Sequence, residues 1–110
     1  MAVKSYTKEN GTGDSVIITW VLTSGDTGEP IGLSDYSDRT VTMTGTFGAA
    51  VTLDGSNDKS TWMTQSNIAD SDISKTANGI EVVGTNPVWT RPAAGAVTSV
   101  TVIINAVRGK

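Results

Sequence analysis

The chain has 110 residues, a length that suits one ordinary domain, and 37% of them are hydrophobic, enough for a thin core. Histidine and cysteine are both absent, which removes the commonest general base, disulfides, thiolate nucleophiles and zinc–cysteine sites. The net charge is −3, no basic stripe is present for nucleic acid, and no apolar run reaches the ~18 residues of a membrane span.

The N-terminal segment is polar. Residues 1–14 hold two glycines and lack the apolar stretch of a secretory signal. The sequence therefore predicts a flexible N-terminal arm over residues 1–14, followed by a single domain over residues 15–110.

The first predicted strand covers residues 15–22, "SVIITWVL". One face of it carries Val16, Ile18, Trp20 and Leu22, and the other carries Ile17, Thr19 and Val21. The second face is unusually apolar for a face in contact with water. Either both faces are covered within the domain, or the outer face meets a partner.

A long loop is expected over residues 23–37, and two alternating segments follow it. Residues 38–48, "DRTVTMTGTFG", and 49–56, "AAVTLDGS", both show the period-two pattern of half-buried strands. Because the join "GTFGA" is short and contains glycine, these two strands are expected to pair as a hairpin.

The second half of the chain predicts four further strands, over residues 61–64, 79–84, 86–92 and 97–107. Pro92 is expected to end the third of them, and residues 65–78 are expected to be irregular. The whole pattern predicts an all-β fold, an antiparallel β-sandwich of about seven to eight strands. Jelly-roll and immunoglobulin-like topologies both remain open.

No catalytic constellation is evident. Three acid pairs share loops, namely Asp54 with Asp58, Asp70 with Asp72, and Asp35 with Asp38. None of these pairs is set in an evident apolar cleft that would shift a carboxyl pKa. Acidic side chains in turns usually form hydrogen bonds with their own backbone. The sequence predicts no enzymatic activity, no catalytic residue and no cofactor.

The segment "LDGSNDKSTW", residues 53–62, is dense in possible oxygen ligands. An EF-hand is excluded, because Gly55 comes too early and no glutamate follows at the required distance. A looser calcium site built on Asp54 and Asp58 is an alternative to a polar turn. We favour the turn and predict no metal.

Tryptophan and arginine are the residues most typical of binding surfaces. Trp20 is expected in the core, whereas Trp62 and Trp89 lie beside loops, where they either pack inside or form a platform for a sugar. Trp89 and Arg91 share one face of their strand. They form either a contact surface or an arginine that simply stacks on its neighbour.

Two stretches, "DRTVTMTGTFGAAVTLDGSNDKSTW" and "NGIEVVGTNPVWTRPAAGAVTSVTVIINA", resemble the head decoration (cement or staple) proteins of short-tailed bacteriophages. The resemblance covers about residues 38–107. It implies a jelly-roll-like domain, without catalysis, on the outer surface of an icosahedral capsid. There it would bridge neighbouring major capsid proteins against internal DNA pressure, after synthesis in the host cytoplasm. It also implies a homo-oligomer, either a dimer at two-folds or a trimer at three-folds.

The capsid hypothesis names candidate contact residues in three places, with no direct contact to nucleic acid or membrane. They are Lys4, Tyr6 and Lys8 on the arm, Asp35 and Tyr36 in the long loop, and Trp89 with Arg91. Two alternatives remain: a carbohydrate-binding module on a virion surface that uses Trp62 or Trp89, and a structural protein of a phage tail.

Overall fold

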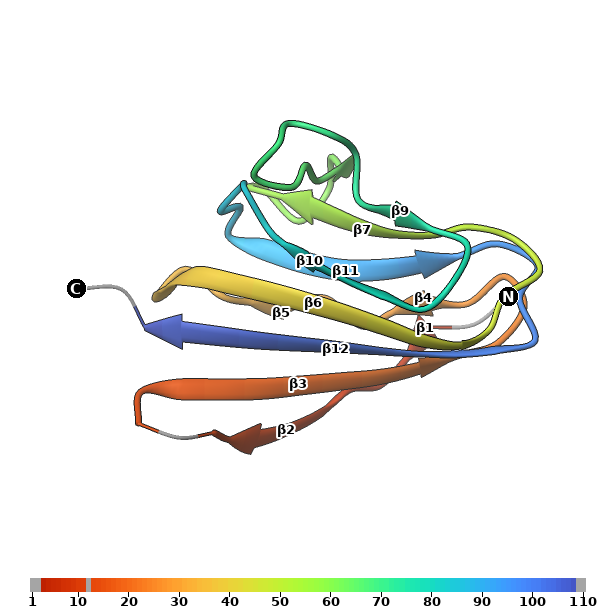
Figure 1. Cartoon of the computed structure of the whole chain (residues 1–110). Helices are drawn as coiled ribbons and strands as arrows, with labels where there is room; N and C mark the ends of the chain where they lie inside the picture. Colours follow the sequence, from red (N-terminus) through yellow and green to blue (C-terminus); the bar gives the residue numbers. More distant parts are fainter. Residues whose placement is uncertain (1–2, 12, 109–110) are drawn as a thin grey trace.

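The computed structural model describes residues 3–11 and 13–108, and in these residues two β-sheets face each other (Figure 1). The prediction of an all-β antiparallel sandwich is confirmed, although one strand pair is parallel. Within the described residues, no helix is long and apolar enough to cross a membrane.

The first sheet, sheet A, is built mainly from short strands. Its order is β1-β4-β11-β7-β8, with β5 paired to β11 and β9 paired to β7. Its strands are β1 (Val3–Lys4), β4 (Thr27–Gly28), β5 (Ile31–Gly32), β7 (Val51–Ser56), β8 (Met63–Thr64), β9 (Ser74–Lys75) and β11 (Trp89–Ala94).

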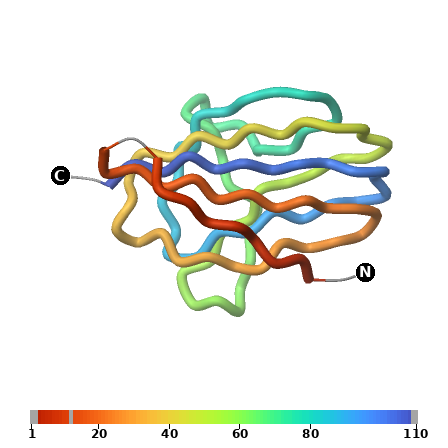
Figure 2. Tube along the Cα trace, turned by 90° about the horizontal axis from the view of Figure 1, so that it is seen from below, coloured from red at the N-terminus to blue at the C-terminus, as the bar shows by residue number. Residues whose placement is uncertain are grey.

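The second sheet, sheet B, contains the three longest strands, with β12 at its centre between β6 and β3 (Figure 2). Its order is β10-β6-β12-β3-β2, and all its pairs are antiparallel. Its strands are β2 (Thr7–Asn10), β3 (Ser15–Leu22), β6 (Tyr36–Thr46), β10 (Gly79–Val82) and β12 (Ser99–Arg108).

The core lies between the sheets and is supplied by alternate residues of the long strands. Trp20, predicted as a core residue, is fully buried, and its indole Nε1 donates a hydrogen bond to the Glu29 carbonyl at 3.0 Å. Burial of each large apolar side chain contributes about 1.5–3 kcal/mol. The inward residues of β3, β6 and β12 are Val16, Ile18, Trp20, Leu22, Val41, Met43, Val100, Val102, Ile104 and Ala106.

The predicted hairpin between residues 38–48 and 49–56 is wrong. β6 pairs with β10 and β12 in sheet B, whereas β7 pairs with β8, β9 and β11 in sheet A. The segment between them crosses from one sheet to the other, and Phe47 and Ala49 pack against the core on the way. Period-two alternation identifies the buried face of a strand, but it does not identify the strand beside it.

The expected N-terminal arm is also corrected for the residues that the structure describes. Val3–Lys4 pairs in parallel with β4, and Thr7–Asn10 pairs with β3. Between these strands, the Tyr6 ring meets the Trp20 ring edge-on, with 6.0 Å between centroids. Residues 3–10 are thus part of both sheets. Met1, Ala2 and Thr12 of the predicted arm, and residues 109–110 of the predicted domain, lie outside the described residues.

Pro92 does not end its strand, because β11 continues through it to Ala94. On one side β11 pairs with β7 along its whole length. On the other side Trp89 and Thr90 pair with β5, and Ala93 pairs with β4. Pro92 therefore lies where the neighbouring strand is interrupted, a position at which no backbone donor is needed.

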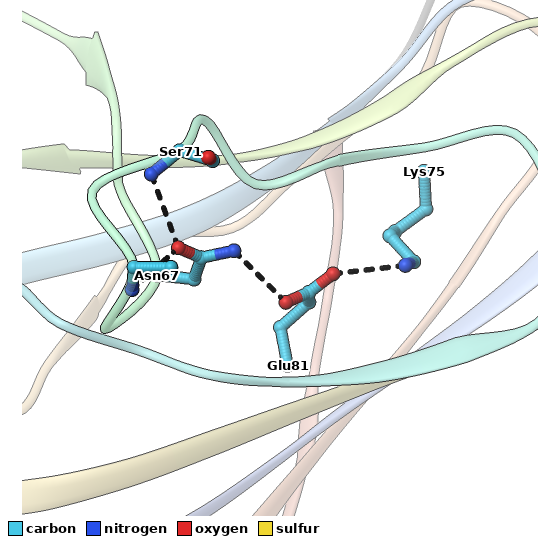
Figure 3. Close-up of polar contacts among 5 residues, drawn as sticks. Asn67, Ser71, Lys75 and Glu81 are labelled. Carbon is cyan, nitrogen blue, oxygen red and sulfur yellow. Dashed lines mark hydrogen bonds and ion pairs between the residues drawn. The ribbon is translucent and has the colours of Figure 1, made fainter.

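A polar network closes one seam between the sheets (Figure 3). Lys75 on β9 forms an ion pair with Glu81 on β10 at 2.9 Å, and the Asn67 amide donates to the other Glu81 oxygen at 3.1 Å. These two hydrogen bonds lower the pKa of the Glu81 carboxyl. Asn67 also accepts the Ser71 backbone N–H at 3.1 Å, so the side chain that binds Glu81 on sheet B also closes the 65–72 loop on itself.

Candidate functional site

The outer face of sheet A brings Trp89 and Arg91 together, as predicted. On β11 they point away from the core, since the residues between and beyond them, Thr90 and Pro92, are buried. On the adjacent strand β7, Arg91 lies opposite Asp54 and Trp89 lies opposite Ser56. Trp89 and Arg91, both half-buried and both of types favoured in binding hot spots, therefore lie next to each other along β11 on the outer face.

The loop after β7 is held in a defined shape by Asp58. Its carboxylate accepts the backbone N–H groups of Ser60 at 2.9 Å and Thr61 at 2.7 Å, together with the Ser56 hydroxyl. These bonds lower the pKa of Asp58 to about 2. The interpretation of this segment as a self-satisfied polar turn is confirmed.

This loop adds two more side chains to the outer face. Lys59, in a left-handed conformation with φ 65°, is held by the hydrogen bond from its N–H to the Ser56 hydroxyl at 2.9 Å. Its ammonium lies 4.3 Å from the centre of the Trp89 ring, and the Arg91 guanidinium carbon lies 4.0 Å from that of Trp62. We call Lys59, Trp62, Trp89 and Arg91 the tryptophan–cation cluster.

The cations of this cluster have no acidic partner among the described residues. The two ion pairs found there join Lys4 to Asp26 and Lys75 to Glu81. The Nε atom of Arg91 is buried and has no hydrogen-bond acceptor. Asp54 lies opposite in the sheet, but its Oδ1 accepts the Thr52 hydroxyl at 3.0 Å.

An open groove of about 560 Å³ lies beside the cluster, between the 55–58 segment, β8 and residues 85–87. Most of its lining side chains are polar and uncharged, and the side chain of Met63, at its edge, is 70% exposed. None of the four cluster residues lines this groove, and Gly55 and Met63 pair on the side of sheet A opposite to Arg91, so the groove opens at the end of the sandwich next to the 57–62 loop.

The two candidate sugar platforms are both partly covered. Each ring packs against a cation, and the Trp89 ring also lies so close to Gly32 that a Cβ there would contact it. A stacking platform for a sugar needs an open ring face. The rings are instead engaged in cation–π contacts within the protein surface.

The candidate contact residues of the N-terminal segment lie elsewhere and are largely engaged. Lys4 pairs with the buried Asp26 at 3.8 Å, and Tyr6 packs against Trp20. The hydrogen bonds from Thr23 and the charge of Lys4 lower the pKa of Asp26. Lys8 is exposed on β2, at the edge of sheet B.

The candidates of the long loop form a third group. Asp35 is exposed in the turn between β5 and β6, and Tyr36 opens β6 with its ring 5.6 Å from the Arg108 guanidinium. Interaction with Tyr36 raises the pKa of Arg108. The seven predicted contact residues thus lie in three separate places, and only Trp89 and Arg91 are neighbours in the cluster.

Sequence reasoning did not place Lys59 or Trp62 beside these two residues. Both come from the 57–62 loop, whose fold over sheet A depends on the hydrogen bonds of Asp58 and Ser56. The density of Asx and Ser residues there signals a tight turn. Nothing in it signals the direction in which the turn projects its side chains.

Among the described residues, no group of three His, Cys, Asp or Glu side chains is placed to hold a metal ion. The two acids considered for calcium have other hydrogen-bond partners, the Thr52 hydroxyl for Asp54 and loop amides for Asp58.

No protein-family profile matches the chain, and no curated protein matches it either. Solved structures do share its fold. The SPBc2 prophage-derived protein YomS has a TM-score of 0.64 at 14% identity, over 90% of this chain and 99% of that one. A cupin domain from Bordetella pertussis Tohama I has a TM-score of 0.60 at 11% identity, over 98% and 96%. At these identities the likeness shows the fold alone, and the fold is a cupin-like jelly-roll sandwich.

An oxalate oxidase is also similar, with a TM-score of 0.60 and 10% identity over 96% of this chain, which spans 51% of that protein. This finding corrects the prediction that the chain is not an enzyme. The prediction was based on the missing histidine and cysteine and on the lack of an apolar cleft. The same fold supports catalysis in the oxidase, so the fold gives no ground for excluding it. The likeness assigns no reaction to this chain.

Proposed function

We propose that the chain is a structural protein of a phage particle that binds the outer surface of an icosahedral capsid and links neighbouring major capsid proteins. The observation that carries the proposal is the tryptophan–cation cluster. It combines the residue types of binding hot spots with cations that the described part of the chain leaves unpaired. The sequence resemblance to head decoration proteins, and a fold shared with a prophage-derived protein, support the same proposal.

Under this proposal the outer face of sheet A meets the capsid. Its central aromatic and arginine side chains would be desolvated by the partner, and the polar groove beside them would lie nearer the rim. Because each copy makes a modest contact, many symmetric copies on one shell would supply retention through avidity.

We also propose that the protein forms a small homo-oligomer through the outer face of sheet B. Rows of residues cross this face in register, such as Ile80–Thr42–Ile103–Thr19–Thr7. The parallel row contains Val82, Thr40, Asn105, Ile17 and Glu9, of which only Glu9 is charged. With ten residues in β12, five strands offer a face of up to about 800 Å², the size of one side of a standard interface.

Sedimentation velocity tests the oligomer. The wild-type protein should sediment as a dimer or trimer at micromolar concentration, and Ile103→Lys should sediment as a monomer, because it places a charge in the middle of the face. An Ile103→Lys protein that keeps the wild-type oligomeric state would remove sheet B from the proposal. Rings or fibres of the purified protein would favour a tail protein instead.

Co-sedimentation tests the capsid function. Heads of the phage that carries this gene, assembled without the protein, are mixed with the purified chain and pelleted through a sucrose cushion. Binding should saturate at a fixed ratio to the major capsid protein, and the decorated heads should release DNA at a higher temperature than bare heads. Absence of binding to heads at micromolar concentration would overturn the proposal.

A further inference from the structure

The tryptophan–cation cluster presents two cations that are not paired with the nearby acids, Asp54 opposite Arg91 in the sheet and Asp58 before Lys59 in the chain. Neither Lys59 nor Arg91 forms an ion pair within the described residues, while the only resolved ion pairs there involve other lysines. Stacking on an aromatic ring satisfies the face of a guanidinium but leaves its N–H groups, which lie in its plane, available for acceptors. The cluster therefore has unused hydrogen-bond donors that point away from the stacking contact.

Arg91 carries the sharper signal of the two. Its Nε atom is inaccessible to water and bonds to no acceptor in the described structure. A buried donor without an acceptor lowers stability and is rare in native structures, so the fold does not satisfy the Arg91 guanidinium as it satisfies a structural arginine. Because the buried Nε is closed to an incoming group, a ligand reaches the guanidinium at its terminal N–H groups, which have no acceptor among the described residues and also form a fork that matches the two oxygens of a carboxylate.

The loop holds the second cation in place before any partner arrives. Asp58 and Ser56 fix the backbone on both sides of Lys59, whose ammonium rests over Trp89. Trp89 and Arg91 are two residues apart on the same face of β11, so Lys59 adds a second positive charge to the face that carries the Arg91 guanidinium. A preorganised pair of this kind loses little conformational entropy on binding.

Taken together, these contacts lead to one ligand chemistry. We propose that the tryptophan–cation cluster binds a carboxylate, supplied by an acidic side chain on the surface of the partner protein. This inference rests on the function proposed above and specifies what its sheet A surface recognises.

A single carboxylate fits this surface better than a polyanion does. Asp54 lies opposite Arg91 in the sheet, and Asp58 precedes Lys59, so two negative charges lie close to the two cations. A nucleic acid, with a phosphate at every residue, would meet these carboxylates and a chain of net charge −3. A single carboxylate brings one negative charge to the Arg91 fork and meets less of this repulsion than a polyanion does.

The side-chain Nε–H resonance of Arg91 in the ¹⁵N-labelled full chain reports directly on this site. The probes are acetate, an acetylated tri-glutamate peptide, the matching tri-glutamine peptide and inorganic phosphate. Acetate and tri-glutamate should move the resonance downfield in a saturable way, and tri-glutamine should not. Arg91→Lys retains the charge without the fork and should weaken tri-glutamate binding, followed by tryptophan fluorescence, by roughly tenfold.

Arg108→Gln is the matched control. Arg108 also lies over an aromatic ring, but this ring is Tyr36, which is not part of the cluster. It should leave tri-glutamate binding unchanged, and an equal loss in this variant would overturn the assignment to the cluster. A response to phosphate with none to carboxylates would overturn the carboxylate and identify a phosphate site.

Two further outcomes separate this inference from the proposed function. If heads bind the protein but no carboxylate moves the Arg91 resonance, the carboxylate inference fails and the capsid function remains. If carboxylates bind with the expected response but heads do not bind, the capsid function fails and the site remains.

Discussion

Two arginines of this molecule are surrounded in opposite ways. Arg39, near the start of β6, is 3% exposed and donates to the carbonyls of Leu33, Tyr36 and Pro87 at 2.6, 2.9 and 3.0 Å. Arg91, on β11, rests on Trp62 and leaves its buried Nε without an acceptor. Burial lowers the pKa of the Arg39 guanidinium. The exposed Arg108 shows the opposite direction, because its interaction with Tyr36 raises its pKa.

The contrast separates charge that belongs to the fold from charge that is available to a partner. Arg39 joins the turn of residues 33–36 to Pro87 and donates a hydrogen bond from each of its three nitrogens within the chain, so its removal would open the end of the sandwich. Arg91 contributes only a stacking contact to the folded state. If structural and available charges differ in this way, variants of the two arginines should differ most in stability.

Replacement of the two arginines by methionine should affect stability very differently. Arg39→Met removes three hydrogen bonds to backbone carbonyls and should lower the free energy of unfolding by about 3 kcal/mol. Arg91→Met retains the packing on Trp62 and should cost less than about 1 kcal/mol. Urea denaturation of both variants measures the difference, and equal losses would contradict the division.

The Lys75–Glu81 pair should give an intermediate effect. Both side chains are about one quarter exposed, so solvent screens the pair and its coupling energy should be about 1 kcal/mol. A double-mutant cycle of Lys75→Met and Glu81→Gln measures this energy directly. A coupling energy of zero would mean that the network of Figure 3 does not help to close the seam between the sheets.

The same pair predicts how stability depends on pH. The pKa of Glu81 is lower in the folded state than its ordinary value of 4.5, so its stabilising contribution is complete above that pH. It is lost as the pH falls through the lowered folded-state pKa. The stability difference between wild type and Glu81→Gln, measured by thermal melts from pH 7 to pH 2.5, should shrink over this range. A difference that stays constant to pH 2.5 would contradict the assignment.

The smallest effect concerns the loop that holds Lys59 over Trp89. The Asp58 carboxyl should titrate with a pKa of about 2, because the folded loop donates backbone N–H groups to its ionised form. A ¹³C NMR titration of the side-chain carboxyl measures this value in the native protein. A titration near the ordinary aspartate value of 3.8 would mean that the loop does not preorganise the cluster.

The sequence predicted the long strands well and their neighbours poorly. Strands β3 and β12 alternate buried and outward residues over most of their length and β6 does so over residues 39–43, which is the pattern that a half-buried strand requires. The hairpin at residues 45–49 was wrong, because alternation does not say to which sheet a strand belongs. The strands at Val3–Lys4 and Thr7–Asn10 are polar edge strands, and such strands lack the apolar pattern.

The candidate site was half predictable for a related reason. Trp89 and Arg91 share a face because residues two apart in a strand always do. Their contacts with Lys59 and Trp62 depend on the path of a loop that is held by side-chain hydrogen bonds, a property without sequence periodicity. The prediction of no enzymatic activity failed at another level, because missing residue types do not determine what a fold can support.

A cryo-electron microscopy reconstruction of phage heads saturated with the protein, at a resolution that shows side chains, would place the chain on or off the capsid. We expect the outer face of sheet A to lie against the major capsid protein, with Trp89 and Arg91 buried in the contact and an acidic side chain beside Arg91. A reconstruction in which this face points to solvent, or in which the protein is absent from the capsid surface, would contradict it.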